Sequence, residues 1–147
     1  MDEKRELIGI VIFDGEKFLL LHRILNWNGW EFPKGGVKKG ETHLEAIKRE
    51  LFEETGISGY EIISKIDDFG YFDFVKKHNS HATNYLVRAP NTSKITFSNQ
   101  EKSVGGEKIN EHDSYKWFFP NEVVKNIYHD NQKETMKKAI ALLGIGE

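Results

Sequence analysis

The sequence predicts an α/β fold in which helices cover both faces of a mixed central β-sheet, an α/β/α sandwich. Apolar, strand-like runs stand on both sides of one amphipathic helix, and a second amphipathic helix lies near the end of the chain. A chain of 147 residues with 38% hydrophobic content can bury one sizeable core. We therefore expect residues 1–147 to form a single domain.

The first two strands are expected to form a hairpin. Residues 7–13 are a nearly continuous apolar run, Asp14-Gly15 interrupts it, and residues 18–21 resume it. This pattern is typical of two buried strands joined by a tight turn. A polar turn at 26–29 then leads to the segment Trp30-Glu31-Phe32-Pro33-Lys34.

A glycine-containing loop and a helix follow, with the sequence GGVKKGETHLEAIKRELFEETGI over residues 35–57. The apolar stripe of the helix is expected at Leu44, Ile47, Leu51 and Thr55, which recur at helical spacing. Thr42 and Glu45 have the spacing of a capping box, and Gly56 is typical of a helix C-terminus. The sequence therefore predicts a helix from Thr42 to Thr55.

Three carboxylates share one face of this helix. Glu50, Glu53 and Glu54 stand at i, i+3 and i+4, so at about 100° per residue they fall within an arc of roughly 100°. Like charges this close repel unless cations lie among them, and oxygen ligands suit Mg²⁺ or Mn²⁺. Ala46 leaves room in the middle of the arc, and Arg49 can pair with Glu53. The face is a candidate metal site, with a solvated acidic surface as the alternative.

The remaining elements are expected to continue the sandwich. In order, they are strands at 60–66, 69–75 and 83–87, a long loop at 91–113 with a short strand at 95–97, a strand at 115–119, and helices at 122–128 and 133–143. Pro120 is expected to end the last strand, and Asn121 to cap the helix after it. The apolar stripe of the last helix is expected at Met136, Ala139, Ile140 and Leu143.

Composition excludes several classes of function. The net charge of −2 and the pI near 6.3 give no general attraction to nucleic acid or to an anionic membrane. The absence of cysteine excludes disulfides and thiol chemistry. No apolar run reaches the length of a membrane span, and the acidic N-terminus is unlike a secretory signal. We expect a cytoplasmic protein without a membrane partner, either a monomer or a weak dimer.

The loop and helix resemble the Nudix box. Gly35, five residues, Glu41, seven residues and then Arg49-Glu50-Leu51-Phe52-Glu53-Glu54-Thr55-Gly56-Ile57 match that motif at every fixed position. The order of the elements around the box also resembles the Nudix fold. The resemblance implies a hydrolase that acts on nucleoside diphosphates linked to another group.

The same resemblance implies roles for individual residues. Glu50, Glu53 and Glu54 would ligate Mg²⁺ or Mn²⁺, together with the backbone carbonyl of Lys34. Glu54 is expected to act as the general base, a role that it can share with Glu53. Arg49 is expected to support the catalytic carboxylates.

Within the family, the segment Trp-Glu-Phe-Pro-Lys-Gly at 30–35 is most similar to the diadenosine tetraphosphate hydrolases. A second stretch, Glu-His-Asp-Ser-Tyr-Lys-Trp at 111–117, resembles their motif Glu-His-x-x-Tyr-x-Trp. This resemblance implies that Glu111 is a fourth metal ligand or an alternative base. Residues 102–108 lengthen the preceding loop relative to those enzymes, which leaves a lid and a plain surface loop as alternatives.

Those enzymes also stack an adenine on aromatic side chains beside the box. Phe74 is expected in that role, with Tyr71 as its neighbour. The other expected substrate-binding residues are Arg23, Lys34 and Tyr85.

The sequence therefore favours a bis(5′-nucleosyl)-tetraphosphatase that splits diadenosine tetraphosphate into ATP and AMP. An RNA 5′-pyrophosphohydrolase is the alternative, because its loop Trp-x-Phe-Pro-x-Gly-Gly is also similar. A pyrophosphatase for oxidised or normal nucleoside triphosphates is a further alternative. A non-catalytic nucleotide-sensing module ranks low, because Arg49, Glu50, Glu53 and Glu54 are all present. The expected partner is a small nucleotide, and nucleic acid enters only as an RNA 5′ end.

Overall fold

The computed structural model describes residues 4–74, 76–97, 101–104 and 107–145. The strands are β1 (Arg5–Phe13), β2 (Phe18–Arg23), β3 (Gly29–Glu31), β4 (Lys34–Gly36), β5 (Glu61–Asp73), β6 (His78–Arg88), β7 (Glu101–Val104), β8 (Glu107–Asn110) and β9 (His112–Phe118). The helices are α1 (His43–Thr55), α2 (Pro120–Asn126) and α3 (Asp130–Leu143). The main sheet has the order β3-β2-β1-β6-β5, while β4 pairs with β1 and β9 pairs with β2.

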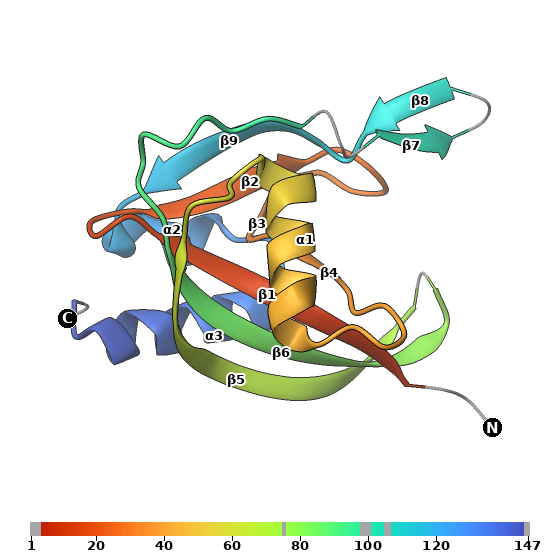
Figure 1. The fold of residues 1–147 in the computed structure, drawn as a ribbon, viewed down its shortest axis with the longest axis horizontal. Helices are drawn as coiled ribbons and strands as arrows, with labels where there is room; N and C mark the ends of the chain where they lie inside the picture. Colours follow the sequence, from red (N-terminus) through yellow and green to blue (C-terminus); the bar gives the residue numbers. More distant parts are fainter. Residues whose placement is uncertain (1–3, 75, 98–100, 105–106, 146–147) are drawn as a thin grey trace.

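The sheet is mixed, and helices pack on both of its faces (Figure 1). Strand β1 runs parallel to β6 and antiparallel to β2 and β4. Alternate residues of β1 point to opposite faces: Ile8 and Ile10 pack in the core beside α1, whereas Val11 and Phe13 pack in the core beside α2 and α3. The predicted α/β/α sandwich is therefore confirmed.

The predicted first hairpin is confirmed as β1 and β2. Phe13 pairs with Phe18. The Asp14 N–H donates to the Lys17 carbonyl at 3.0 Å, and the Asp14 carboxylate accepts from the backbone N–H groups of Glu16 and Lys17 at 2.7 and 2.6 Å. The side chain of Asp14 thus fixes the turn that sets the strand register.

Helix α1 begins and ends as predicted. Thr42 and Glu45 form the complete capping box, and Gly56 has φ of 78°, the left-handed conformation that favours glycine at a helix end. The predicted buried stripe is wrong at one position, because Leu44 is 59% exposed. Ala46 is fully buried in its place, so it packs in the core instead of making room beside the carboxylates.

Several predicted boundaries are wrong. The two strands expected at 60–66 and 69–75 are one strand, β5, because Asp67 and Asp68 continue the pairing with β6, opposite Asn84 and Thr83; the two irregularities in this pairing lie before Asp67. Val75 lies outside the described residues. The segment 95–97 is not a strand; the long loop instead contains the hairpin of β7 and β8, which projects from the body of the domain (Figure 1).

The C-terminal part also starts its elements earlier than predicted. Strand β9 begins at His112. Helix α2 has Pro120 at its first position, so Phe119, not Asn121, precedes the helix. Helix α3 begins at Asp130, and its Met136 and Ala139 are buried as predicted. None of the helices within the described residues is long and apolar enough to cross a membrane.

Candidate active site

Arg49 joins the loop to the carboxylate face of α1. Its guanidinium donates two hydrogen bonds to Glu41, at 2.8 and 2.9 Å, and one to the Gly36 carbonyl at 2.8 Å. It also contacts Glu50 at 2.6 Å and Glu53 at 3.3 Å. The bonds from Arg49 lower the pKa of Glu41 to about 2. Because the guanidinium is occupied by these groups, Arg49 is placed to hold the carboxylates of α1 and not to contact a substrate.

Gly35 allows Glu50 to lie against the loop. A Cβ atom added at Gly35 would lie 2.0 Å from Glu50 Cδ and within 2.3 Å of both carboxylate oxygens. No side chain fits at that distance, so glycine is required for this packing. Glu50 is 9% exposed, and burial raises its pKa although the adjacent Arg49 acts in the opposite direction.

A buried network of charged groups lies behind the carboxylate face. His112 Nε2 lies 2.8 Å from Glu31 Oε2, and His112 Nδ1 lies 3.3 Å from Glu54 Oε2. Arg23 Nη1 contacts Glu111 at 2.6 Å and Glu31 at 3.2 Å. Glu31, Glu54 and His112 are all buried. Residues from β2, β3, β9 and α1 are thereby tied together.

Burial and pairing shift the pKa values in this network. Burial raises the pKa of Glu54 to about 7, although His112 pairs with it. Burial alone would lower the pKa of His112, but its bonds to Glu31 and Glu54 outweigh that effect and raise the pKa to about 9. Burial would raise the pKa of Glu31, but His112 and the nearby cations lower it overall. At neutral pH, His112 is therefore a cation between two carboxyl groups.

A cleft of about 780 Å³ runs past these groups. Most of the site residues predicted from the sequence line it: Arg23, Lys34, Glu50, Glu53, Glu54, Tyr71, Phe74 and Glu111. Tyr85 is not brought to the cleft. It lies on the face of β6 that packs towards α1, where its hydroxyl lies 2.8 Å from His43 Nδ1. Successive side chains of a strand point to opposite faces of the sheet, and Tyr85 points to the face covered by α1. The prediction that Tyr85 binds the substrate is therefore corrected.

One group of aromatic side chains in the cleft comes from the end of β5. Tyr71, Phe72 and Phe74, here called the β5 aromatic group, all line the cleft. Phe74 is 82% exposed, and its ring centroid lies 4.9 Å from that of Phe72. Strand β5 is one edge of the main sheet.

A second aromatic group, which the sequence analysis missed, comes from the opposite edge of the sheet. Trp27 lies in the connection from β2 to β3. Its ring stacks on that of Tyr128 and packs edge-to-face against that of His129, and the ring centroids are 4.6 Å apart in both pairs. We call Trp27, Tyr128 and His129 the Trp27 group, of which Trp27 and His129 line the cleft. The Tyr128 N–H donates to the Trp30 carbonyl, which fixes the group to β3.

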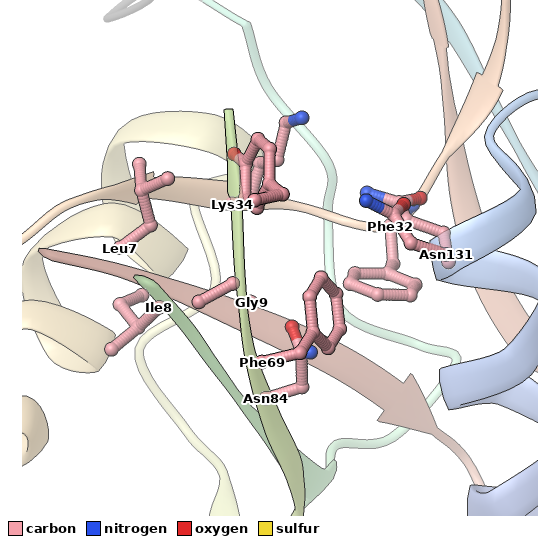
Figure 2. Close-up of a pocket in the computed structure, with 11 residues that line it drawn as sticks. Leu7, Ile8, Gly9, Phe32, Lys34, Phe69, Asn84 and Asn131 are labelled. Atoms are coloured by element: carbon pink, nitrogen blue, oxygen red, sulfur yellow. The ribbon is translucent and has the colours of Figure 1, made fainter. Parts of the chain in front are cut away.

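A small recess opens beside the cleft, between the sheet and α3 (Figure 2). Phe32, Phe69 and the amide of Asn84 lie around Gly9. The recess holds about 20 Å³, whereas one water needs roughly 10–15 Å³ on this measure. It is too small for a nucleobase in this structure, so the larger cleft is the candidate substrate site.

The carboxylates fit a divalent cation. Ligand atoms of Glu54, Glu111 and His112 all lie within 4.8 Å of one another. Both nitrogens of His112 face carboxylates, which leaves the oxygens of Glu54 and Glu111 as the suitable donors, with Glu50 and Glu53 along the same helix. Oxygen donors of this kind are typical of Mg²⁺ and Mn²⁺ sites.

Glu31, His112 and the Trp27 group were not predicted from the sequence to be site residues. Glu31 and His112 do lie in the two stretches that resemble the tetraphosphate hydrolases, and this position could have indicated that they belong to the site. Trp27 stood in a segment read only as a polar turn, and nothing in its sequence context linked it to the distant His129.

Similar sequences and structures are found among known proteins. A family model described as NUDIX domain matches residues 3–142. An RNA pyrophosphohydrolase of Bartonella bacilliformis is 30% identical over 133 residues, covering 77% of this chain and 76% of that protein. An RNA pyrophosphohydrolase of Marinomonas sp. is 30% identical over 151 residues, covering 94% of each.

Among solved structures, a binary complex of the C. elegans Ap4A hydrolase is similar, with a TM-score of 0.77. The match covers 95% of this chain and 98% of that chain at 24% sequence identity. At 24% sequence identity, this similarity shows a shared fold and nothing more.

Replacing Gly35 tests the packing of Glu50. Since the carboxylate is the mobile end of its side chain, we expect Gly35→Ala to fold with Glu50 displaced, which weakens Mn²⁺ binding about tenfold or more. Binding is measured by electron paramagnetic resonance titration, and folding by circular dichroism. Gly59→Ala is the matched control, because no atom lies within 4 Å of the added Cβ. Equal Mn²⁺ affinity in the two variants would contradict the role of Gly35.

The pH dependence of metal binding tests Glu54. Because burial raises the pKa of Glu54 to about 7, a proton competes with the cation below that pH. We expect the Mn²⁺ dissociation constant to fall as pH rises towards 7, by up to about tenfold per unit for one proton, and to level off above it. Glu54→Gln should bind more weakly and flatten this profile. An unchanged profile in that variant would show that another group sets the pH dependence.

Proposed function

The chain belongs to the Nudix family, and from that premise we propose that it hydrolyses dinucleoside polyphosphates with a divalent cation. Diadenosine tetraphosphate is the proposed substrate. One water is consumed. Its oxygen bonds to a phosphorus of the tetraphosphate, one phosphoric anhydride bond of the substrate breaks, and the products are ATP and AMP.

The observation that carries this proposal is the distribution of charge and aromatic groups in the cleft. The β5 aromatic group and the Trp27 group come from opposite edges of the five-strand path. Four strand spacings separate these edges, roughly 19 Å at about 4.8 Å per spacing. Carboxylates of α1, together with Arg23 and Lys34, line the same cleft. Such a site suits a substrate with a polyanionic middle and a nucleobase at each end.

The surroundings of the charged residues support the roles that we propose for them. Glu50, Glu53, Glu54 and Glu111, with the Lys34 carbonyl, are the proposed metal ligands; a bound divalent cation neutralises phosphate charge and makes a coordinated water more acidic. Glu54 is proposed to accept the proton of the attacking water, since its pKa near 7 suits a general base. Arg23 and Lys34 are proposed to attract the phosphate oxygens.

The aromatic residues would supply affinity. Stacking contributes about 1–3 kcal/mol per base and tolerates any base. Phe74 is available for stacking because it is 82% exposed. Neutral imidazole is favoured at His129, because burial and then the charges of Lys34 and Arg23 lower its pKa. That side chain can therefore both donate to and accept from the edge of a base.

Removal of pyrophosphate from a triphosphorylated RNA 5′ end is the second candidate. The names of two relatives favour it, and one base plus a triphosphate would occupy part of the same cleft. The net charge of −2 gives less support for a long RNA track.

Product analysis tests the substrate. Purified protein with Mg²⁺ is offered diadenosine tetraphosphate, triphosphorylated RNA, and oxidised and normal nucleoside triphosphates, and the products are separated by chromatography. We expect ATP and AMP from the dinucleotide at a kcat/KM at least tenfold above that of the other substrates. Preference for RNA would favour the second candidate, and no turnover with Mg²⁺ or Mn²⁺ would favour a nucleotide-sensing module.

Single aromatic substitutions test the two-base arrangement. Phe74→Ala and Trp27→Ala should each raise the KM for diadenosine tetraphosphate about tenfold, since each removes one stacking contact. ATP has one base and can occupy only one of the two aromatic groups. When ATP is used as a competitive inhibitor, only one of the two variants should therefore raise the inhibition constant. Phe52→Ala is the matched control, because Phe52 is 50% exposed on α1 and is not among the residues lining the cleft. Unchanged KM values in both variants would exclude this arrangement.

A further inference from the structure

His112 joins two carboxylates that belong to different parts of the fold. It is 1% exposed, and its two ring nitrogens face Glu31 on β3 and Glu54 on α1. The residue itself begins β9, where the pairing with β2 shifts in register between His22 and Arg23. Such a shift inserts an extra residue and changes the direction of the side chains beside it.

The surroundings of His112 argue against a role as a metal ligand. A ring nitrogen can bind a metal only through a free lone pair, and a nitrogen that donates a hydrogen bond has none. In this structure Nε2 lies 2.8 Å from Glu31, Nδ1 lies 3.3 Å from Glu54, and His112 is 1% exposed. Because both ring nitrogens are directed at carboxylates, His112 is placed to hold these groups instead of offering a lone pair to a cation.

We propose that His112 is a positioning residue that holds the Glu54 carboxylate at the end of α1 in the orientation required to bind the catalytic cation. The proposal rests on the proposed metal role of Glu54. Glu31 anchors the imidazole from the opposite side, and Arg23 pairs with Glu31 and Glu111. When His112 is replaced, Glu31 keeps its contact with Arg23 at 3.2 Å, whereas the contact between Glu54 and His112 is lost. A buried carboxylate that loses a charged partner tends to protonate or move.

Mn²⁺ binding to the whole protein tests the proposal without relying on turnover. We expect His112→Gln to weaken Mn²⁺ affinity by about 10–100-fold, the range typical when a residue that orients a ligand is replaced. His22→Gln is the matched control. It removes another histidine–carboxylate pair between β2 and β9, His22 with Asp113 at 2.8 Å, which does not include Glu54. The affinity of this control should stay within twofold of the wild type.

A double-mutant cycle separates positioning from general destabilisation. If His112 acts through Glu54, His112→Gln should weaken Mn²⁺ binding less than twofold when Glu54 is already Gln. An equal loss in both backgrounds, or no loss in either, would overturn the proposal. If Glu54→Gln itself leaves Mn²⁺ affinity unchanged, the proposed metal role of Glu54 fails. If Glu54→Gln weakens binding and His112→Gln does not, only the role of His112 fails.

The wild-type protein provides a test that does not depend on the folding of a variant. In a spectrum of ¹⁵N-labelled imidazole, Nδ1 of His112 should keep the same protonation state when saturating Mg²⁺ is added. Loss of the Nδ1 proton on addition of Mg²⁺ would instead indicate direct ligation and would overturn the positioning role.

Discussion

The arrangement of the site depends on the cost of burying several carboxylates close together. Glu31, Glu50 and Glu54 are at most 9% exposed, and an unpaired buried carboxylate costs several kcal/mol or takes up a proton. Glu50 is paired by its neighbour Arg49 within α1. The cations that pair with the other two come from distant segments: His112 on β9 contacts Glu54 and Glu31, and Arg23 on β2 contacts Glu31.

These pairs also explain how the fold holds the loop that precedes α1. Arg49 bonds Glu41 and the Gly36 carbonyl, so the same guanidinium that orients Glu50 fixes the loop from β4. The backbone of β4 pairs with β1 in the centre of the sheet. The carboxylates are thus connected, through Arg49 and β4, to the largely buried strand β1, and such a rigid support suits the geometric precision that a metal site requires.

How far the sequence could predict this site depended on whether the contacts were local. The helix, its capping box and the face of Glu50, Glu53 and Glu54 follow from spacing within a few turns, and they were predicted. The exposure of Leu44 was not, because only the packing of the sheet decides which flank of α1 is buried. The pairing of His112 with Glu31 joins residues 81 positions apart, and no periodicity in the sequence indicates such a contact.

The separation of stacking and charge in the cleft has a consequence for specificity. Aromatic faces accept any base, so neither the β5 aromatic group nor the Trp27 group distinguishes adenine strongly by stacking alone. What the sheet fixes instead is the distance from each group to the carboxylates of α1, because the groups lie at opposite edges and the loop of β4 lies on the central strand. On this reasoning, the length of the phosphate chain is the property that the proposed site selects most directly, and base identity is secondary.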